Sequence, residues 1–470
     1  MAEIAKRGSQ ASGRIRGAGL STATYPSRLY AWYVVAVLMV AYTFSFIDRQ
    51  ILSLLVGPME RDLQISDTQV SLLQGFAFAL FYTLLGLPIG RMVDSRSRIG
   101  IISLGVFVWS LMTGMCGMAK AYWQLFIFRM GVGVGEAALS PAAYSVITDS
   151  FPPKGLGLAL GVYSMGIYIG SGLALVIGAE VVGFVSQGGN FTLPLIGDVY
   201  NWQVVFFVVG FPGVLIALWA RTLIEPVRHG MVRAVAGGPA SASISLGKTL
   251  GYLIQNAAAF LFMTLCLSFV ALTAYGTSAW VPAFFVRTYG WNIVEAGRWY
   301  GWIIILFGTT GVVAGGAAGD FLKQRGVKAG RIWIMIVGAA GMLPGAWIFP
   351  LVDDPTVALY LLVPTVFFST VGFGTGPAAL QEMMPNQMRG LAAAVSLFLI
   401  NLIGLGLGPT TYAWTTEHIF EDKLMLRYSL SYVSIGTLSV AVLFGLLALR
   451  PYAKSLTTLE YWKADHGAQH

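Results

Sequence analysis

The stretch YAWYVVAVLMVAYTFSFIDRQILSLLV, residues 30–56, is long and apolar enough to cross a lipid bilayer as one helix. Similar apolar runs of about 20 residues recur along the whole chain of 470 residues. Only 11% of the residues are charged, whereas soluble domains carry roughly 25%. The runs are continuously apolar rather than alternating, which favours helices over a transmembrane barrel. The sequence therefore predicts an all-α, multi-pass integral membrane protein.

Twelve transmembrane helices are predicted from these runs, at residues 30–57, 69–91, 99–119, 121–148, 155–185, 203–223, 255–285, 297–318, 331–350, 357–383, 390–414 and 428–449. The longest polar connection, residues 224–254, lies near the middle of the chain and separates six spans from six. We therefore expect an N-terminal six-helix bundle at 30–223 and a C-terminal one at 255–450. Cytoplasmic tails are expected at 1–29 and 451–470.

Basic residues are distributed unequally between the two sides that these spans define. Of the 29 lysines and arginines, 21 fall in the two tails and the even-numbered connections, and six fall on the opposite side. Cytoplasmic loops of membrane proteins are enriched in lysine and arginine. We therefore expect both termini in the cytoplasm and the protein in the plasma (inner) membrane. The net charge of +8 then reflects topology, so no nucleic-acid partner is expected.

Two sequence phrases each have a counterpart in the other half of the chain. GRMVDSRSR (90–98) follows the second span, and GGAAGDFLKQR (315–325) follows the eighth. TDSFPPKGLGLA (148–159) likewise corresponds to QEMMPNQMRGLA (381–392). Both offsets are about 230 residues, so the two halves are predicted to be pseudo-symmetric copies, as in many secondary transporters with a site between their halves. The superposed pairs are Gly90 and Gly316, Asp94 and Asp320, and Asp149 and Glu382.

Asp48 and Arg49 are the only charged residues between Arg28 and Glu60. Ionisable groups within a bilayer are costly and by default face a cavity or a partner. Neighbouring residues on a helix point about 100° apart, so each charge is expected to meet its own partner. The alternative is that the first span ends before Asp48 and that both charges lie at the membrane surface.

Arg129 and Glu136 lie seven residues apart and so share one face of the fourth predicted helix. Glu136 is either a structural partner of Arg129, or a group that faces a central cavity as the counter-ion of Arg49 or as a proton site. Because a guanidinium group keeps its proton, Asp48 and Glu136 are the proton-coupling candidates.

Several motifs resemble those of the major facilitator superfamily. GRMVDSRSR is similar to the loop motif between its second and third helices, and RMGVGVGEAA (129–138) is similar to its fourth-helix motif, an arginine followed by spaced glycines. Glu136, together with IDRQ in the first helix and SFPP after the fourth, resembles the Spinster branch. The loop motif departs from the family at Ser95, where a basic residue is usual; Arg96 and Arg98 follow it.

The resemblance implies the major facilitator fold, in which helices 1, 4, 7 and 10 face the cavity. Substrate-binding candidates on these helices are Tyr42, Phe46, Arg49, Glu136, Ser140, Tyr144, Thr277 and Trp280. The resemblance also implies that Asp94 and Asp320 latch the outward-facing state, although loop charges alone would explain the neighbouring bases. The motif and gating candidates are Gly90, Asp94, Arg96, Arg98, Arg129, Gly133, Asp149, Gly316, Asp320, Glu382 and Arg389.

Spinster relatives carry lysophospholipids or sphingosine phosphate, so the resemblance implies a secondary active transporter of an amphiphilic lipid, proton-coupled and working by alternating access. We expect an anionic head group on Arg49 and an apolar tail against the helix walls. A transporter of a sugar or a small organic anion is the first alternative, and an intramembrane lipid-modifying enzyme is the second.

The enzyme alternative is disfavoured because the four histidines lie outside the predicted spans, and no catalytic or metal-ligand pattern is present. We therefore expect no enzymatic activity, metal or cofactor. The expected partners are the lipid substrate, protons and membrane lipids, and the expected state is a monomer.

Overall fold

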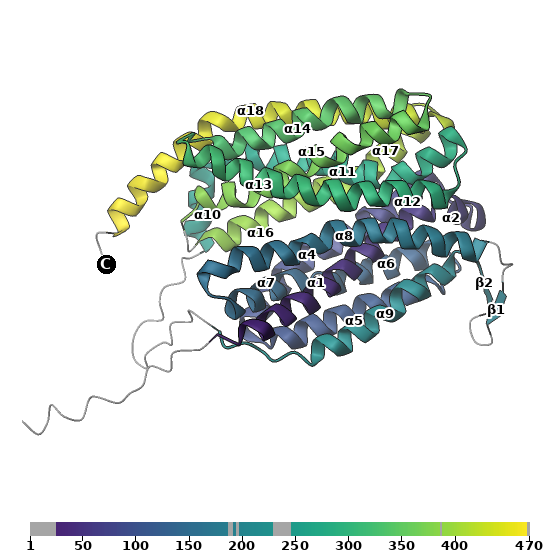
Figure 1. The fold of residues 1–470 in the computed structure, drawn as a ribbon, viewed down its shortest axis with the longest axis horizontal. Coiled ribbons are helices and arrows are strands. Elements are labelled where there is room, and N and C mark those ends of the chain that lie inside the picture. Colours follow the sequence, from purple (N-terminus) through teal and green to yellow (C-terminus); the bar gives the residue numbers. More distant parts are fainter. Residues whose placement is uncertain (1–24, 187–190, 194–196, 229–245, 386–387, 468–470) are drawn as a thin grey trace, which may run out of the picture.

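The chain forms two helical bundles that lie side by side (Figure 1). The structure is a computed structural model and describes residues 25–186, 191–193, 197–228, 246–385 and 388–467. Within these ranges, twelve helical segments are long and apolar enough to cross a membrane, which confirms the predicted all-α class and the number of spans.

The N-terminal bundle contains spans 1 to 6 and one short hairpin. Its elements are α1 (Arg28–Ile51), η1 (Leu52–Leu54), α2 (Val56–Leu63), α3 (Asp67–Gln74), α4 (Phe76–Ser95), α5 (Arg98–Cys116), α6 (Tyr122–Glu136), α7 (Leu139–Ser150), α8 (Pro153–Ser186), β1 (Phe191–Leu193), β2 (Gly197–Val199) and α9 (Gln203–Arg221). Strands β1 and β2 pair antiparallel, with Phe191 opposite Val199.

The C-terminal bundle contains spans 7 to 12. Its elements are α10 (Leu246–Gln255), α11 (Ala257–Tyr289), α12 (Ile293–Ile303), η2 (Ile304–Gly308), α13 (Thr309–Gln324), α14 (Gly330–Ile348), η3 (Phe349–Leu351), α15 (Pro355–Glu382), α16 (Arg389–Ile400), η5 (Asn401–Gly406), α17 (Leu407–His418), η6 (Lys423–Met425) and α18 (Leu426–Gly467). Helix α18 continues past residue 450, where the sequence placed the end of the bundle.

The helices run between two ends of the molecule that differ in the chain segments they carry. The start of α1 and the end of α18 lie at one end, called the termini end, and the β1–β2 hairpin marks the other, called the hairpin end (Figure 1). Most spans run between these two ends (Figure 1), so a residue's place within its span shows which end it lies closer to.

Several spans are interrupted or irregular along their length, among them spans 4, 8 and 11. Helix α6 ends at Glu136 and α7 begins at Leu139, because Pro141 has no N–H to donate to the carbonyl four residues earlier. Segments η2 and η5 are π-helical. Such segments are frequent at functional sites, and both of them contribute residues to the cavity described below.

Close helix packing joins the two bundles toward the hairpin end. A Cβ atom added to Gly172 would lie 2.5 Å from the carbonyl oxygen of Gly301, and one added to Gly75 would lie 2.5 Å from that of Leu405. Small residues of this kind allow the backbones of neighbouring helices to approach. No larger side chain fits at these positions without displacing the partner helix.

Ion pairs also connect the bundles at the hairpin end. The guanidinium of Arg287 lies 2.7 Å from Asp67 and 3.2 Å from Glu60, and the ammonium of Lys423 lies 3.1 Å from Glu60. Among the described residues, ion pairs at the termini end connect only helices of the same bundle. The described ion pairs between the bundles therefore lie at the hairpin end, which they close.

Candidate functional site

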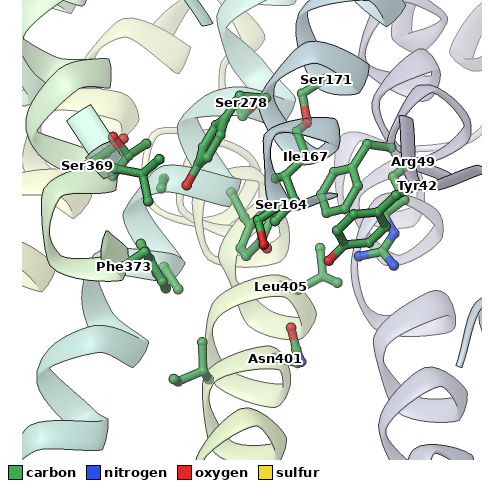
Figure 2. A pocket seen from close by; sticks show the side chains of 18 of the residues that line it. Tyr42, Arg49, Ser164, Ile167, Ser171, Ser278, Ser369, Phe373, Asn401 and Leu405 are labelled. Carbon is green, nitrogen blue, oxygen red and sulfur yellow. The ribbon is translucent and has the colours of Figure 1, made fainter. Parts of the chain in front are cut away.

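A cavity of about 910 Å³ lies between the two bundles. Figure 2 shows Tyr42 and Arg49 on one side of it and Ser369 and Phe373 of α15 on the other. The cavity extends toward the termini end, where the lining residue Leu158 is 66% exposed. It stops short of the ion pairs that close the hairpin end.

Arg49 is the single charged residue among the described residues that line this cavity. Its guanidinium carbon lies 4.6 Å from the ring centre of Phe46, 4.4 Å from that of Phe78 and 4.9 Å from that of Tyr82. Aromatic faces attract a cation at these distances. The three rings therefore hold the guanidinium in place beside an otherwise uncharged wall.

Glu136 is the ionic partner of Arg49. Its Oε2 atom accepts hydrogen bonds from Arg49 Nε at 2.7 Å and from the hydroxyl of Ser45, and it lies 2.6 Å from Arg49 Nη2. The second oxygen, Oε1, has no hydrogen-bond partner among the described residues. Glu136 is only 1% exposed and is not part of the cavity lining, so it lies behind Arg49 rather than beside it.

Asp48 and Arg129 form a second buried pair, with 3.0 Å between Arg129 Nη1 and Asp48 Oδ1. The hydroxyl of Thr113 also donates to Asp48. Both charged residues lie outside the cavity lining. Of Asp48, Arg49 and Glu136, only Arg49 lines the cavity. Asp48 faces Arg129 instead, because adjacent helix residues point about 100° apart.

The other substrate-binding candidates divide into two groups. Tyr42, Phe46, Ser140, Tyr144 and Thr277 line the cavity. Trp280 does not: it is fully buried, and its Nε1 donates to the carbonyl of Pro409 at 2.9 Å. The residue types did not reveal this difference, because both Thr277 and Trp280 lie on α11 one helical turn apart.

The cavity wall includes five more spans than the expected helices 1, 4, 7 and 10, namely spans 2, 5, 8, 9 and 11. Figure 2 shows Ser164, Ile167 and Ser171 on α8, and Leu405 and Asn401 on η5. The lining residues that the sequence analysis missed include Gln50, Ser53, Gln74, Tyr82, Ser164, Tyr168, Tyr275, Ser278 and Asn401. Gln74, Phe78 and Tyr82 recur at a spacing of four, and this polar and aromatic face was the signal available in the sequence.

The duplicated motifs form one charge cluster in each bundle at the termini end. The buried Arg98 pairs with Asp149 and, at 2.7 Å, with Glu225. In the other bundle Arg331 lies 2.8 Å from Glu382 and 2.7 Å from Asp320. Arg331, which the sequence analysis did not single out, thus takes the place of Arg98 in the second copy.

The remaining motif candidates have varied surroundings. Arg389 Nε donates to the carbonyls of Gln381 and Met384, and a Cβ on Gly133 would lie 2.5 Å from the carbonyl of Phe78. Arg96 is exposed. Gly90 has open space around it, whereas a Cβ on Gly316 would lie 3.2 Å from the carbonyl oxygen of Gly374. The side chain of Asp94 lies outside the described residues.

Glu225 acts as an acceptor for the start of α5. It accepts hydrogen bonds from the backbone N–H groups of Arg98 and Ile99 and from the Ser97 hydroxyl. Burial alone would raise the pKa of Glu225, but the hydrogen bonds from Arg98 and from these groups lower it. The carboxylate is therefore ionised and fixes the start of α5 to the segment after α9.

Comparisons with known proteins agree with this architecture. The sequence model of the family described as Major Facilitator Superfamily matches residues 38–409. An MFS-type efflux pump of Mycolicibacterium smegmatis is 26% identical, covering 83% of this chain and 86% of its own length. The hexuronate transporter of Escherichia coli is 26% identical, covering 70% of this chain and 75% of its own length.

Two solved structures are similar over more than nine tenths of the chain. The crystal structure of a bacterial homologue to the human lysosomal transporter Spinster, inward-facing and unoccupied, has a TM-score of 0.74 and 28% identity, and the match covers 92% of this chain and 98% of that one. The D-xylose-proton symporter has a TM-score of 0.66 at 16% identity, with 91% and 99% covered, which is a likeness of fold alone.

Proposed function

Because this chain belongs to the Major Facilitator Superfamily and has a Spinster-like fold, we propose that it transports an anionic amphiphile of the lysolipid type by proton-coupled alternating access. The observation that carries the proposal is the cavity with one positive charge, Arg49, in a wall that otherwise lacks charge. The anionic head group pairs with Arg49, and the acyl chain lies against apolar residues such as Val313, Phe373 and Leu397.

Competition for Arg49 supplies a coupling mechanism. The substrate's anion and Glu136 both require the same guanidinium, which Glu136 holds at 2.6 Å in this conformation. When the substrate takes over Arg49, the buried carboxylate loses its counter-charge, and an unpaired buried charge is strongly disfavoured. Glu136 then takes up a proton on Oε1, and it releases that proton when Arg49 returns. Asp48, the other candidate, keeps Arg129 as its partner throughout this exchange.

The closed hairpin end and the accessible termini end correspond in this proposal to an inward-facing state. The termini end carries most of the lysines and arginines of the chain, which supports a cytoplasmic position for it. The hairpin end then faces the outside of the plasma (inner) membrane. The transport unit in this proposal is a monomer, because one chain supplies both walls of the cavity.

Transport of a sugar acid is the second candidate. Relatives include hexuronate and galactarate/D-glucarate transporters, and hydroxyl groups of Tyr42, Ser140 and Ser164 line the cavity beside Arg49. Hydroxyls in such positions suit a polyhydroxylated anion. The extent of apolar wall on the α13, α15 and α16 side favours the lipid.

Uptake by the purified full-length protein in liposomes tests the proposal. We expect transport of a lysophospholipid, accelerated by a pH gradient, to exceed transport of glucuronate. Arg49→Ala should lower uptake at least tenfold, since it removes the only charge that pairs with the head group. The matched control is Arg221→Ala, an exposed arginine at the end of α9.

Normal lysolipid uptake by the Arg49→Ala protein would contradict the assignment of the head-group site. Glucuronate uptake without lysolipid uptake would favour the second candidate. Recovery of chemically altered lipid would show an enzyme instead of a transporter.

A further inference from the structure

The closed end of the cavity carries a second polar group of residues beyond Arg49. Gln50, Ser53, Gln74 and Ser278 all line the cavity there. None of them is charged, and they come from α1, η1, α3 and α11. This patch is therefore shared between the two bundles and lies where they meet.

Gln50 and Gln74 differ in how they use their amide groups. Gln50 Nε2 donates to the carbonyl of Ser278 at 3.0 Å, and its Oε1 accepts from the Ser278 hydroxyl at 3.1 Å. Gln74 is only 7% exposed, yet neither its Nε2 nor its Oε1 has a hydrogen-bond partner among the described residues. Buried polar side chains are almost always hydrogen-bonded. Gln74 lines the cavity, and its amide, which is enclosed in this conformation, keeps hydrogen-bonding capacity that a bound substrate can satisfy.

The position of Gln74 follows from the face of span 2 that it shares with its neighbours. Ser71, one turn toward the hairpin end, donates its hydroxyl to Thr410 of the other bundle at 3.3 Å. Phe78, one turn in the other direction, lies with its ring 4.4 Å from the guanidinium carbon of Arg49. Gln74 thus lies between the contact that closes the cavity and the ring that supports Arg49, about 6 Å along the helix from Phe78.

The backbone holds Gln74 in this position. The next residue, Gly75, approaches the carbonyl of Leu405 so closely that an added Cβ would lie 2.5 Å from that oxygen. The break between α3 and α4 is therefore packed against η5. The backbone at the end of α3 therefore cannot move away from the cavity without separating these two segments.

We infer that Gln74 is a specificity-determining residue that binds a neutral hydroxyl or amide group of the substrate, close to the anionic group on Arg49. The inference rests on the proposed function and deepens it. A carboxamide offers donors and an acceptor but no charge, so it suits a group that both donates and accepts. The substrate then carries its anion and a neutral hydrogen-bonding group about one helical turn apart.

Binding of matched ligand pairs to the purified full-length protein, measured by calorimetry, tests this inference. Lysophosphatidylglycerol and lysophosphatidylpropanol with the same acyl chain differ only in head-group hydroxyls and share one negative charge. D-glucuronate and cyclohexanecarboxylate form a second pair without an acyl chain. The wild-type protein should prefer the hydroxylated member of at least one pair by about tenfold, the effect of one or two hydrogen bonds.

Gln74→Leu should abolish that preference by weakening the hydroxylated ligand, while the hydroxyl-free ligand binds within about twofold of its wild-type affinity. Gln74→Asn keeps the amide and should retain part of the preference. Gln324→Leu, at an exposed position at the end of α13, is the control. A preference that survives in Gln74→Leu, or an equal loss for both members, would overturn the inference.

The wild-type measurement stands by itself if a variant does not fold. A wild-type protein without a preference in either pair overturns the role of Gln74. If the protein binds the glucuronate pair but neither lipid, the proposed lipid substrate is contradicted. The preference for glucuronate over cyclohexanecarboxylate then decides whether Gln74 binds a hydroxyl group.

Discussion

The four charges that connect α1 with α6 form two separate pairs. Asp48 pairs with Arg129, and Arg49 pairs with Glu136. Asp48 and Arg49 are adjacent on α1, and their partners Arg129 and Glu136 are seven residues apart on α6. The two pairs therefore lie on different sides of the contact between these helices. One pair is sealed from the cavity, whereas the other presents its arginine to it. Similar residue types thus serve a structural role in one case and a proposed transport role in the other.

The two carboxylates are therefore expected to respond differently to neutralisation. Glu136→Gln should fold normally and should transport at a rate that no longer depends on the pH gradient, because the amide cannot exchange a proton. Asp48→Asn leaves Arg129 as an unpaired buried charge, so it should lower the free energy of unfolding by about 3–5 kcal/mol. Uptake in liposomes at two pH gradients measures the first effect, and thermal unfolding in detergent measures the second.

A Glu136→Gln protein with full proton dependence would place the coupling site elsewhere. An Asp48→Asn protein as stable as the wild type would remove the structural assignment of the Asp48–Arg129 pair.

At the scale of helices, the closed hairpin end depends on glycines where the two bundles touch. Helices α8 and α12 meet at Gly172 and Gly301, each of whose added Cβ atoms would collide with the other's carbonyl oxygen. This contact joins the two bundles in the conformation with a closed hairpin end, so we expect a larger side chain there to penalise that conformation.

Gly172→Ala should therefore shift the protein away from the conformation with a closed hairpin end. Spin labels on α2 and α12 should report a larger distance across that end by double electron–electron resonance. Gly161→Ala on the same helix is the control, because a Cβ there would have nothing within 4 Å. An unchanged distance distribution in Gly172→Ala would show that the backbones accommodate the methyl group.

The positions of the regular helices could be predicted from the sequence, whereas the interruptions within them could not. Hydropathy located all twelve spans, and the repeated phrases located the charge clusters around Arg98 and Glu382. The π-helical turns in η2 and η5 pack against α8 and α4 of the opposite bundle, contacts that the local sequence does not reveal. Asn401 enters the cavity through such a turn, and so it was not predicted. Trp280 lies outside the cavity lining for a related reason, because its hydrogen-bond partner Pro409 in α17 comes from a distant part of the sequence.

For the molecule as a whole, pH is expected to change the balance between the two conformations through the hairpin end. Burial and the nearby carboxylate of Asp67 raise the pKa of Glu60 to about 7, against the lowering effect of Arg287 and Lys423. When this end opens, Glu60 becomes hydrated and its pKa returns toward the ordinary value of 4.5. The closed state thus binds the proton more tightly than the open state does.

The stabilisation of the closed state is complete below pH 4.5 and is lost as the pH rises through about 7. Spin-label distances across the hairpin end should lengthen between pH 5 and pH 8 in the wild-type protein. Glu60→Gln should remove this dependence, because the amide is neutral at both values. A wild-type distance that is constant over this range would show that Glu60 does not control closure.

The π-helical turns have a mechanical consequence for the molecule. Within the described ranges both of them, η2 and η5, belong to the C-terminal bundle, and each contains more residues per turn than the α-helix around it. If such a turn changes to α-helical hydrogen bonding, its helix twists or lengthens slightly without unfolding. We therefore expect the two halves of the cavity wall to differ in motion: the C-terminal side adjusts its helix geometry around the bound substrate more readily than the N-terminal side, which holds Arg49.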